Sequence, residues 1–154
     1  MQRGEEIPDA AVEVLNQRGD LGRIHCSNGS LEIGALITFE EVAHHPAFRA
    51  LVPDIESFMF LIASLQIRNR ATLSGNVVNA SPIGDMTILL LALDAKVCLA
   101  RGNSTRTVDL RSFYRGYKVL DKESDEILTG FPFALSGEFR KGIEANVPGH
   151  RHRQ

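Results

Sequence analysis

A stretch of fifteen residues, Ala71 to Asp85, most limits how this chain can fold, because it has neither helical nor strand periodicity. It is rich in Ser, Asn, Gly and Pro, and apolar segments expected to be helices lie on both sides of it. An irregular segment of this length is uncommon inside a compact domain unless it serves a function. The fold must therefore support a long polar segment between two core elements.

The residue types in this segment suit a ligand with phosphate or heteroaromatic groups. Glycines such as Gly75 and Gly84 allow the backbone to approach a ligand closely. Consecutive backbone N–H groups, hydroxyls and amide side chains can together form a concave anion site. The segment has no phosphate-loop lysine and no G-x-G-x-x-G turn. From these residues alone, a purely structural loop with local Asn and Ser turns stays equally open.

The segments before it predict a hairpin followed by helices. Residues 23–26 and 31–35 alternate in polarity around an Asn-Gly pair, which is typical of a tight β-hairpin. Thr38 lies three residues before Glu41, which predicts a capping box and a short helix ending near His45. A longer helix is expected from about Pro53. Its apolar positions have helical spacing: Phe58, Leu61, Ile62 and Leu65.

The segments after it predict further strands. We expect a buried helix at 86–93, strands at 96–100, 105–108 and 127–135, and a helical turn at 110–114. Pro132 would restrict the last strand to an edge or a bulge. The predicted fold class is therefore α+β, with a mixed or antiparallel sheet and helices on one side.

Composition excludes several classes of protein. The 154 residues suit one domain or two small subdomains, and the formal net charge of −2 gives no sign of nucleic-acid binding. Cys26 and Cys98 cannot by themselves hold an iron–sulfur cluster, and a reduced pair is favoured over a disulfide. The longest apolar run, Ile88 to Leu93, is far shorter than the roughly 20 residues of a membrane span. With a polar N-terminus, these features predict a cytoplasmic protein without a membrane segment.

Three consecutive motifs resemble the FAD-binding loop of xanthine dehydrogenases and related molybdenum hydroxylases, Q-I-R-N-x-A-T-x-G-G-N-x-x-x-A-S-P-x-x-D. They are Gln66-Ile67-Arg68-Asn69, Ala71-Thr72-Leu73-Ser74-Gly75-Asn76 and Asn79-Ala80-Ser81-Pro82-Ile83-Gly84-Asp85. The resemblance covers about residues 20 to 135. It implies a FAD-binding-type domain at 21–136, similar to the middle subdomain of the family's FAD-binding domain. Residues 1–20 are then a weakly structured extension, and 137–154 are expected to be a disordered tail.

The resemblance also implies which residues contact FAD. They are Thr72, Leu73, Ser74, Gly75, Asn76 and Asp85 in the polar segment, with Ile62 before it and Leu128 after it. For Ile62 and Leu128 an ordinary core position is favoured over a place beside the cofactor, and Asp85 could also serve as a helix cap. Arg68 and Arg70 could pair with phosphate, although solvated side chains are favoured.

The family resemblance implies an oxidoreductase component that passes electrons from a partner iron–sulfur subunit to NAD+ or oxygen, with a molybdopterin subunit as the second partner. The chain departs from the pattern at Ser74, where the family usually has glycine. The family's A-G-G-T-D loop and its C-terminal subdomain are not recognisable. The alternative is therefore a truncated remnant that binds no flavin, or a subunit-interaction module. No residue is expected to act as nucleophile, general base or metal ligand, and the histidines are expected to be structural or solvated.

Overall fold

The computed structural model describes residue 15 and residues 18–27 and 29–135. The expected C-terminal tail at 137–154 and most of the expected extension at 1–20 lie outside the described residues. Among the helices of the described part, none is long and apolar enough to cross a membrane.

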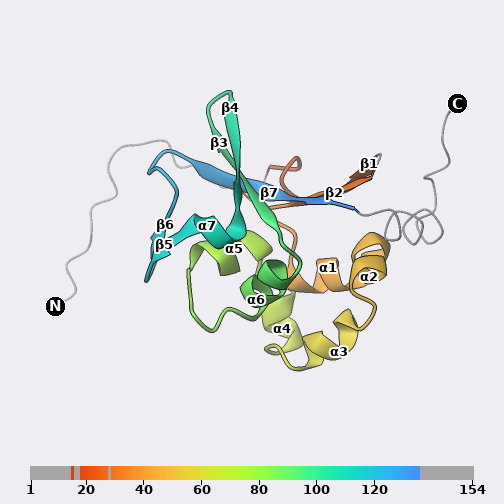
Figure 1. Ribbon diagram of the computed structural model, residues 1–154. Helices are drawn as coiled ribbons and strands as arrows, with labels where there is room; N and C mark the ends of the chain where they lie inside the picture. Colours follow the sequence, from red (N-terminus) through yellow and green to blue (C-terminus); the bar gives the residue numbers. More distant parts are fainter. Residues whose placement is uncertain (1–14, 16–17, 28, 136–154) are drawn as a thin grey trace, which may run out of the picture.

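The centre of the fold is a five-stranded antiparallel sheet with strand order β1-β2-β7-β3-β4. The strands are β1 Ile24–Ser27, β2 Ser30–Gly34, β3 Lys96–Arg101, β4 Ser104–Asp109 and β7 Ile127–Ala134. A separate two-stranded ribbon pairs β5 Tyr114–Gly116 with β6 Val119–Leu120. The helices lie on one side of the large sheet (Figure 1). The predicted α+β class is confirmed. Of the two kinds of sheet that were expected, mixed or antiparallel, the sheet is antiparallel.

Both predicted hairpins are present. In the first, β1 and β2 pair Cys26 with Leu31, and Gly29 in the turn has a φ of 89°, which favours glycine. In the second, β3 and β4 pair over their full length, and Gly102 in the turn has a φ of 55°. Alternating polarity and turn chemistry therefore predicted these strands within one or two residues.

Seven short helices connect the strands in the described part of the chain. They are α1 Phe39–His44, α2 Pro46–Leu51, α3 Ile55–Phe60, α4 Leu65–Arg68, α5 Leu73–Val78, α6 Asp85–Ala92 and α7 Leu110–Phe113. The capping box of α1 is confirmed: Thr38 Oγ1 accepts from the Glu41 N–H at 3.2 Å, and the Glu41 carboxylate accepts from the Thr38 N–H at 2.8 Å. Helix α2 was not predicted; the His45 ring caps it by accepting from the Ala47 N–H.

The long helix expected from Pro53 is wrong in its extent. Helix α3 ends at Phe60, and α4 begins only at Leu65. Between them Ala63 has a φ of 43°, a left-handed conformation that a continuing helix cannot contain. The apolar spacing persists across the break, which is why periodicity alone predicted one helix.

The segment Ala71 to Asp85 is not irregular throughout, so that prediction is also wrong. It contains helix α5, whose first residue follows Thr72 as N-cap. Two buried side chains, Leu73 and Val77, attach this helix to the core at the i, i+4 spacing of one face. A polar helix with so few buried positions shows no clear period in the sequence.

Strand β7 is central and not an edge strand, although it contains Pro132. Its ladder with β3 shifts register, with Cys98 opposite Gly130 and Leu99 opposite Leu128, so Thr129 is an extra residue in β7. The pairing with β3 extends no further than Gly130, while Pro132 is paired with Glu32 of β2. Pro132 therefore lies where β7 is paired on one side only, as at a sheet edge, and the bulge lies three residues away at Thr129.

The core fills the space between the sheet and the helices. Its largest fully buried side chains are Phe48, Phe113, Phe131, Leu31, Ile33, Ile55, Leu73, Met86, Leu90, Leu99 and Leu110. Every helix except α4 contributes a buried apolar residue. Helix α4 therefore depends on polar contacts for its position.

Candidate functional site

The start of α5 is fixed to the sheet by backbone hydrogen bonds through the segment Ala35–Thr38. The Ala35 N–H donates to Thr129 O at 3.0 Å, and the Ala35 carbonyl accepts from the Ser74 N–H at 3.2 Å. The Leu73 N–H donates to Ile37 O at 3.0 Å. Because β7 holds Ala35 and Ala35 holds Ser74, the first turn of α5 has a defined place beside the central strand.

Thr72 and the two residues after Leu73 form the polar start of this helix. Thr72 Oγ1 accepts from the Gly75 N–H at 3.1 Å and lies 3.4 Å from Ser74 Oγ. Gly75 is exposed, and an added Cβ there would meet only Thr72 Oγ1, at 3.0 Å. Its outer side is thus open to a ligand that approaches the backbone closely.

Ser74 requires no unusual backbone conformation. It lies in the first turn of α5 and is not among the residues with positive φ. The changed φ angle that a serine could have required at this position is therefore not found. Its half-buried hydroxyl faces Thr72 and adds a polar atom to the start of the helix.

Asn76 connects the two ends of the polar segment. Its Oδ1 accepts from both the Thr87 N–H and the Thr87 hydroxyl, each at 2.9 Å. Helix α6 has Gly84 as N-cap and no capping side chain of its own, so Asn76 supplies the cap from α5. Asp85, the first residue of α6, is exposed and carries a carboxylate into the same region.

The remaining three predicted residues are almost fully buried. Leu73 has no exposed surface, and Ile62 and Leu128 are 4% and 7% exposed. All three belong to the hydrophobic core cluster. The structure therefore brings Thr72, Ser74, Gly75 and Asn76 together on α5, and it places Asp85 at the start of the neighbouring helix α6. It leaves Ile62 and Leu128 as core residues, with little surface for a ligand, and their contact with a flavin stays a prediction.

An open groove of about 530 Å³ lies beside Thr72. Its polar lining is Thr38, Glu41, Asn69, Arg70, Arg18 and Thr72. Asn69, Arg70 and Thr72 offer donors of the kind that bind phosphate oxygens. The Thr38 hydroxyl instead donates to Glu41 Oε2 at 2.8 Å, and Arg18 pairs with Asp20 at 2.7 Å. Of this lining, the sequence predicted only Thr72 as a ligand contact. The capping box at Thr38 and the Q-I-R-N motif were visible in the sequence, but their convergence on one groove was not.

Arg68 and Arg70, the two arginines of the motif region, differ in their exposure and in their partners. Arg70 is exposed, lines the groove and has no ion pair with a described residue. Arg68 is neither solvated nor open to a phosphate, because its side chain is only 13% exposed. Its Nε donates to Glu40 Oε2 at 2.8 Å, and its Nη1 lies 3.0 to 3.2 Å from the carbonyl oxygens of Met59, Ile62 and Ala63. Both roles expected for Arg68 are therefore wrong.

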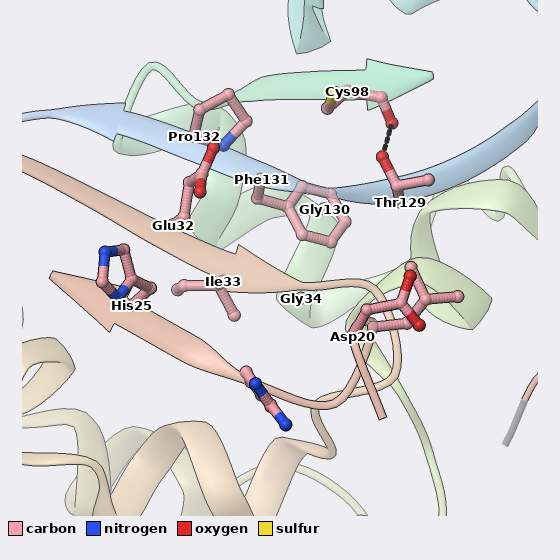
Figure 2. Close-up of a pocket in the computed structure, with 12 residues that line it drawn as sticks. Asp20, His25, Glu32, Ile33, Gly34, Cys98, Thr129, Gly130, Phe131 and Pro132 are labelled. Carbon is pink, nitrogen blue, oxygen red and sulfur yellow. Dashed lines mark hydrogen bonds between the residues drawn. The ribbon is translucent and has the colours of Figure 1, made fainter. Parts of the chain in front are cut away.

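Two other hollows lie away from this groove. One, of about 410 Å³, is lined by Asp20, His25 and Glu32 together with backbone of β2 and β7; Figure 2 shows it, with the Thr129 hydroxyl donating to the Cys98 carbonyl at 3.2 Å. It contains none of the eight predicted residues. The other, of about 230 Å³, is mainly apolar and lies against Gly84, Ile88 and Tyr117, next to Asp85.

A second arginine network, at the partly exposed Arg106, fixes the segment before Leu128. Arg106 of β4 makes a two-point ion pair with Glu126, at 2.6 and 2.8 Å, and also contacts Asp121. The Arg106 guanidinium, with the Glu123 N–H, lowers the pKa of Glu126 from 4.5 to about 2. Glu126, and after it Asp121, raise the pKa of Arg106 above its ordinary value. This network holds the segment that enters β7, and no pattern in the sequence indicated it.

Metal-binding and disulfide chemistry find no support in the described residues. Cys26 and Cys98 are free thiols, and burial raises the pKa of Cys26. Within residues 18–27 and 29–135 there is no cluster of three His, Cys, Asp or Glu side chains arranged for a metal ion.

The chain is similar in sequence to known FAD-binding proteins. The family model described as the FAD binding domain in molybdopterin dehydrogenase matches residues 1–133. The nicotinate dehydrogenase FAD-subunit of Eubacterium barkeri is 33% identical over 127 residues, covering 80% of this chain and 43% of that protein. The putative xanthine dehydrogenase FAD-binding subunit of Escherichia coli is 34% identical over 122 residues, covering 79% and 42%. The chain thus spans about two fifths of the length of these relatives.

Solved structures agree. The crystal structure of quinoline 2-oxidoreductase from Pseudomonas putida matches with a TM-score of 0.69 and 27% identity, covering 77% of this chain and 41% of that one. The reconstituted CO dehydrogenase from Oligotropha carboxidovorans matches with a TM-score of 0.70 and 31% identity, over the same shares. The family match extends further towards the N-terminus than the motifs that first suggested it. The chain belongs to the family of FAD-binding domains found in molybdopterin dehydrogenases.

Proposed function

We propose that this chain is the FAD-binding, electron-transfer component of a xanthine-dehydrogenase-like molybdenum hydroxylase. The observation that carries the proposal is the open polar surface where α5 meets α6, next to a groove with hydroxyl and guanidinium donors. In this account Thr72, Ser74, Gly75, Asn76 and Asp85 contact the cofactor.

The residues present fit the polar part of FAD. Arg70 and Thr72 line a groove of about 530 Å³, and Gly75 has an open side. The Asn76 Oδ1 is occupied by Thr87, so Asn76 would reach a ligand through its Nδ2 group. Ile62 and Leu128 would contact the flavin ring only through the small part of each side chain that stays exposed.

Bound FAD would supply the electron transfer, and the protein would bind, orient and shield it. Electrons would arrive from an iron–sulfur subunit, and a molybdopterin subunit would carry the hydroxylation site. NAD+ or oxygen would be the acceptor. The apolar hollow against Ile88 and Tyr117, adjacent to Asp85, offers an acceptor a place to approach. The relatives whose names contain "medium chain", such as that of carbon monoxide dehydrogenase, support a multi-subunit arrangement.

A specific observation favours a second candidate, a subunit-interaction module that holds no flavin. Phe60 and Leu61 are each 84% exposed, and Leu65 close by is 49% exposed. Large apolar side chains gathered on a surface are typical of protein contacts. If the chain is such an interaction module, it associates with partner subunits and does not bind flavin.

A comparison of three flavins tests the proposal. The full chain is titrated with FAD, FMN and riboflavin, and binding is followed by the quenching of flavin fluorescence. If the groove holds the dinucleotide, FAD binds more tightly than FMN, and riboflavin binds weakest because it offers no phosphate to Arg70 and Thr72. Equal and unsaturable signals for all three compounds would favour the interaction module.

A further inference from the structure

The two walls of the groove come from separate parts of the chain. One wall is the start of α1, with Thr38 and Glu41, and the other is the connection between α4 and α5, with Asn69, Arg70 and Thr72. Two backbone hydrogen bonds join the walls at the base, from Phe39 N–H to Ala71 O and from Leu73 N–H to Ile37 O, each 3.0 Å. The spacing of the groove thus depends on how α4 is held against α1.

Arg68, the last residue of α4, makes that connection. Its Nε–H donates to Glu40 of α1, which precedes the wall residue Glu41. Helix α4 has no buried apolar side chain, so packing cannot replace this contact. The exposed fractions of the two side chains, 13% for Arg68 and 20% for Glu40, place the ion pair largely out of solvent.

The same guanidinium fixes the turn before α4. Its Nη1 is within hydrogen-bond distance of the carbonyl oxygens of Met59, Ile62 and Ala63. Ala63 has a left-handed φ of 43°, a conformation that costs an alanine free energy and needs support from its surroundings. Arg68 supplies that support and so joins α1, the end of α3 and α4 at one point.

We propose that Arg68 is a positioning residue of the groove, which holds the Asn69–Thr72 wall against α1 without touching the ligand. This inference rests on the proposed function for its ligand, the diphosphate part of FAD. The geometry distinguishes Arg68 from Arg70: Arg68 donates to protein oxygens and is mostly buried, whereas Arg70 is exposed in the groove. Arg70 attracts the phosphate groups of the ligand directly, and Arg68 keeps the wall of the groove in place.

The first test needs no flavin. Amide hydrogen exchange is measured in the wild type and in Arg68→Gln, at Phe39 and Leu73, whose N–H groups join the walls. Exchange at both amides accelerates about tenfold or more, while Leu110, whose N–H donates to Ala95 O far from the groove, stays unchanged. Unchanged rates at Phe39 and Leu73, or equal acceleration at all three amides, would overturn the positioning role.

The second test uses FAD. If the competent groove is populated a tenth of the time in Arg68→Gln, the Kd rises about tenfold. The salt dependence of binding stays that of the wild type, because no contact to phosphate is lost. Arg70→Gln, in contrast, weakens binding and flattens its salt dependence. The double variant Glu40→Gln/Arg68→Gln removes the pair at constant net charge and behaves like Arg68→Gln. A flattened salt dependence in that double variant would show direct phosphate contact and contradict the inference.

Two variants complete the design. Arg68→Lys keeps the charge beside Glu40 but offers one ammonium in place of a planar fork, so it restores binding only in part. Arg49→Gln is the matched control, because Arg49 pairs with Glu56 at 3.0 Å on the half-exposed surface of α2 and α3. It leaves exchange and FAD affinity unchanged. If the wild type itself binds no FAD, the proposed function fails. The exchange data still show separately whether Arg68 holds the two walls of the groove together.

Discussion

Asn76 Oδ1 accepts two hydrogen bonds from Thr87, one from the backbone N–H and one from the hydroxyl, each 2.9 Å long. Through this contact a residue of α5 caps α6 from eleven positions earlier in the chain. The contact joins the two ends of the polar segment. Asn76, predicted as a ligand contact, therefore also has a structural role.

Removing this cap is expected to destabilise the protein. Asn76→Ala leaves the Thr87 donors without their partner, which costs about 2 kcal/mol of the free energy of unfolding. The corresponding fall in Tm is roughly 4 to 8 °C. Asn79→Ala, on the exposed end of α5, is the control and changes stability by less than about 0.5 kcal/mol. Thermal unfolding followed by circular dichroism checks both variants, and equal Tm values for the pair would refute the cap.

Gly75→Ala is expected to separate folding from ligand binding. In a helix alanine is favoured over glycine by about 1 kcal/mol, while the new Cβ would lie 3.0 Å from Thr72 Oγ1. These effects oppose each other, so stability changes by less than about 1 kcal/mol. The open side of Gly75 is filled, however, and FAD affinity falls about tenfold.

Ser74→Gly is the companion variant, because it introduces the glycine that is usual in the family. It lowers stability by about 0.5 kcal/mol through helix propensity and leaves FAD affinity equal or higher. Urea unfolding and FAD titration of the two variants check this pattern. If Gly75→Ala bound FAD as the wild type does, the open face of α5 would not be the contact surface.

The ion pair of Arg106 and Glu126 predicts an acid-sensitive part of the stability. The folded-state pKa of Glu126, about 2, lies below the ordinary value of 4.5, so the ion pair stabilises the protein fully above the unfolded pKa of this carboxyl. This stabilisation is lost as the pH falls from about 5 towards 2, because the carboxylate must then be protonated. Urea unfolding at several pH values in this window should show a flatter pH dependence for Glu126→Gln, with lower stability at pH 7. Parallel curves for the two proteins would contradict this role.

Local signals in the sequence were sufficient for the sheet and for α1. Hairpin turns at Gly29 and Gly102 and the capping box at Thr38 act between near neighbours, so their residues reveal them. The break between α3 and α4 is different. It depends on Arg68 reaching the carbonyls of residues 59–63 and on a left-handed Ala63, and no periodicity records such a contact.

The candidate site shows the same division. The motif placed Thr72, Ser74 and Gly75 on one surface, where the structure has them exposed or half-buried at the start of α5. It could not reveal the groove, because Thr38 and Arg70 converge only through the pairing of the Ala35–Thr38 and Ala71–Ser74 segments. Burial of Ile62 and Leu128 likewise follows from tertiary packing.

The visible absorption spectrum of the purified chain, mixed with FAD and then freed of unbound flavin by gel filtration, tests the central claim most directly. If the surface of α5 and the groove beside it hold FAD, flavin bands elute with the protein in a ratio approaching one per chain, and they weaken in Gly75→Ala and Arg70→Gln. Flavin that elutes entirely apart from a folded chain would contradict FAD binding by this protein on its own.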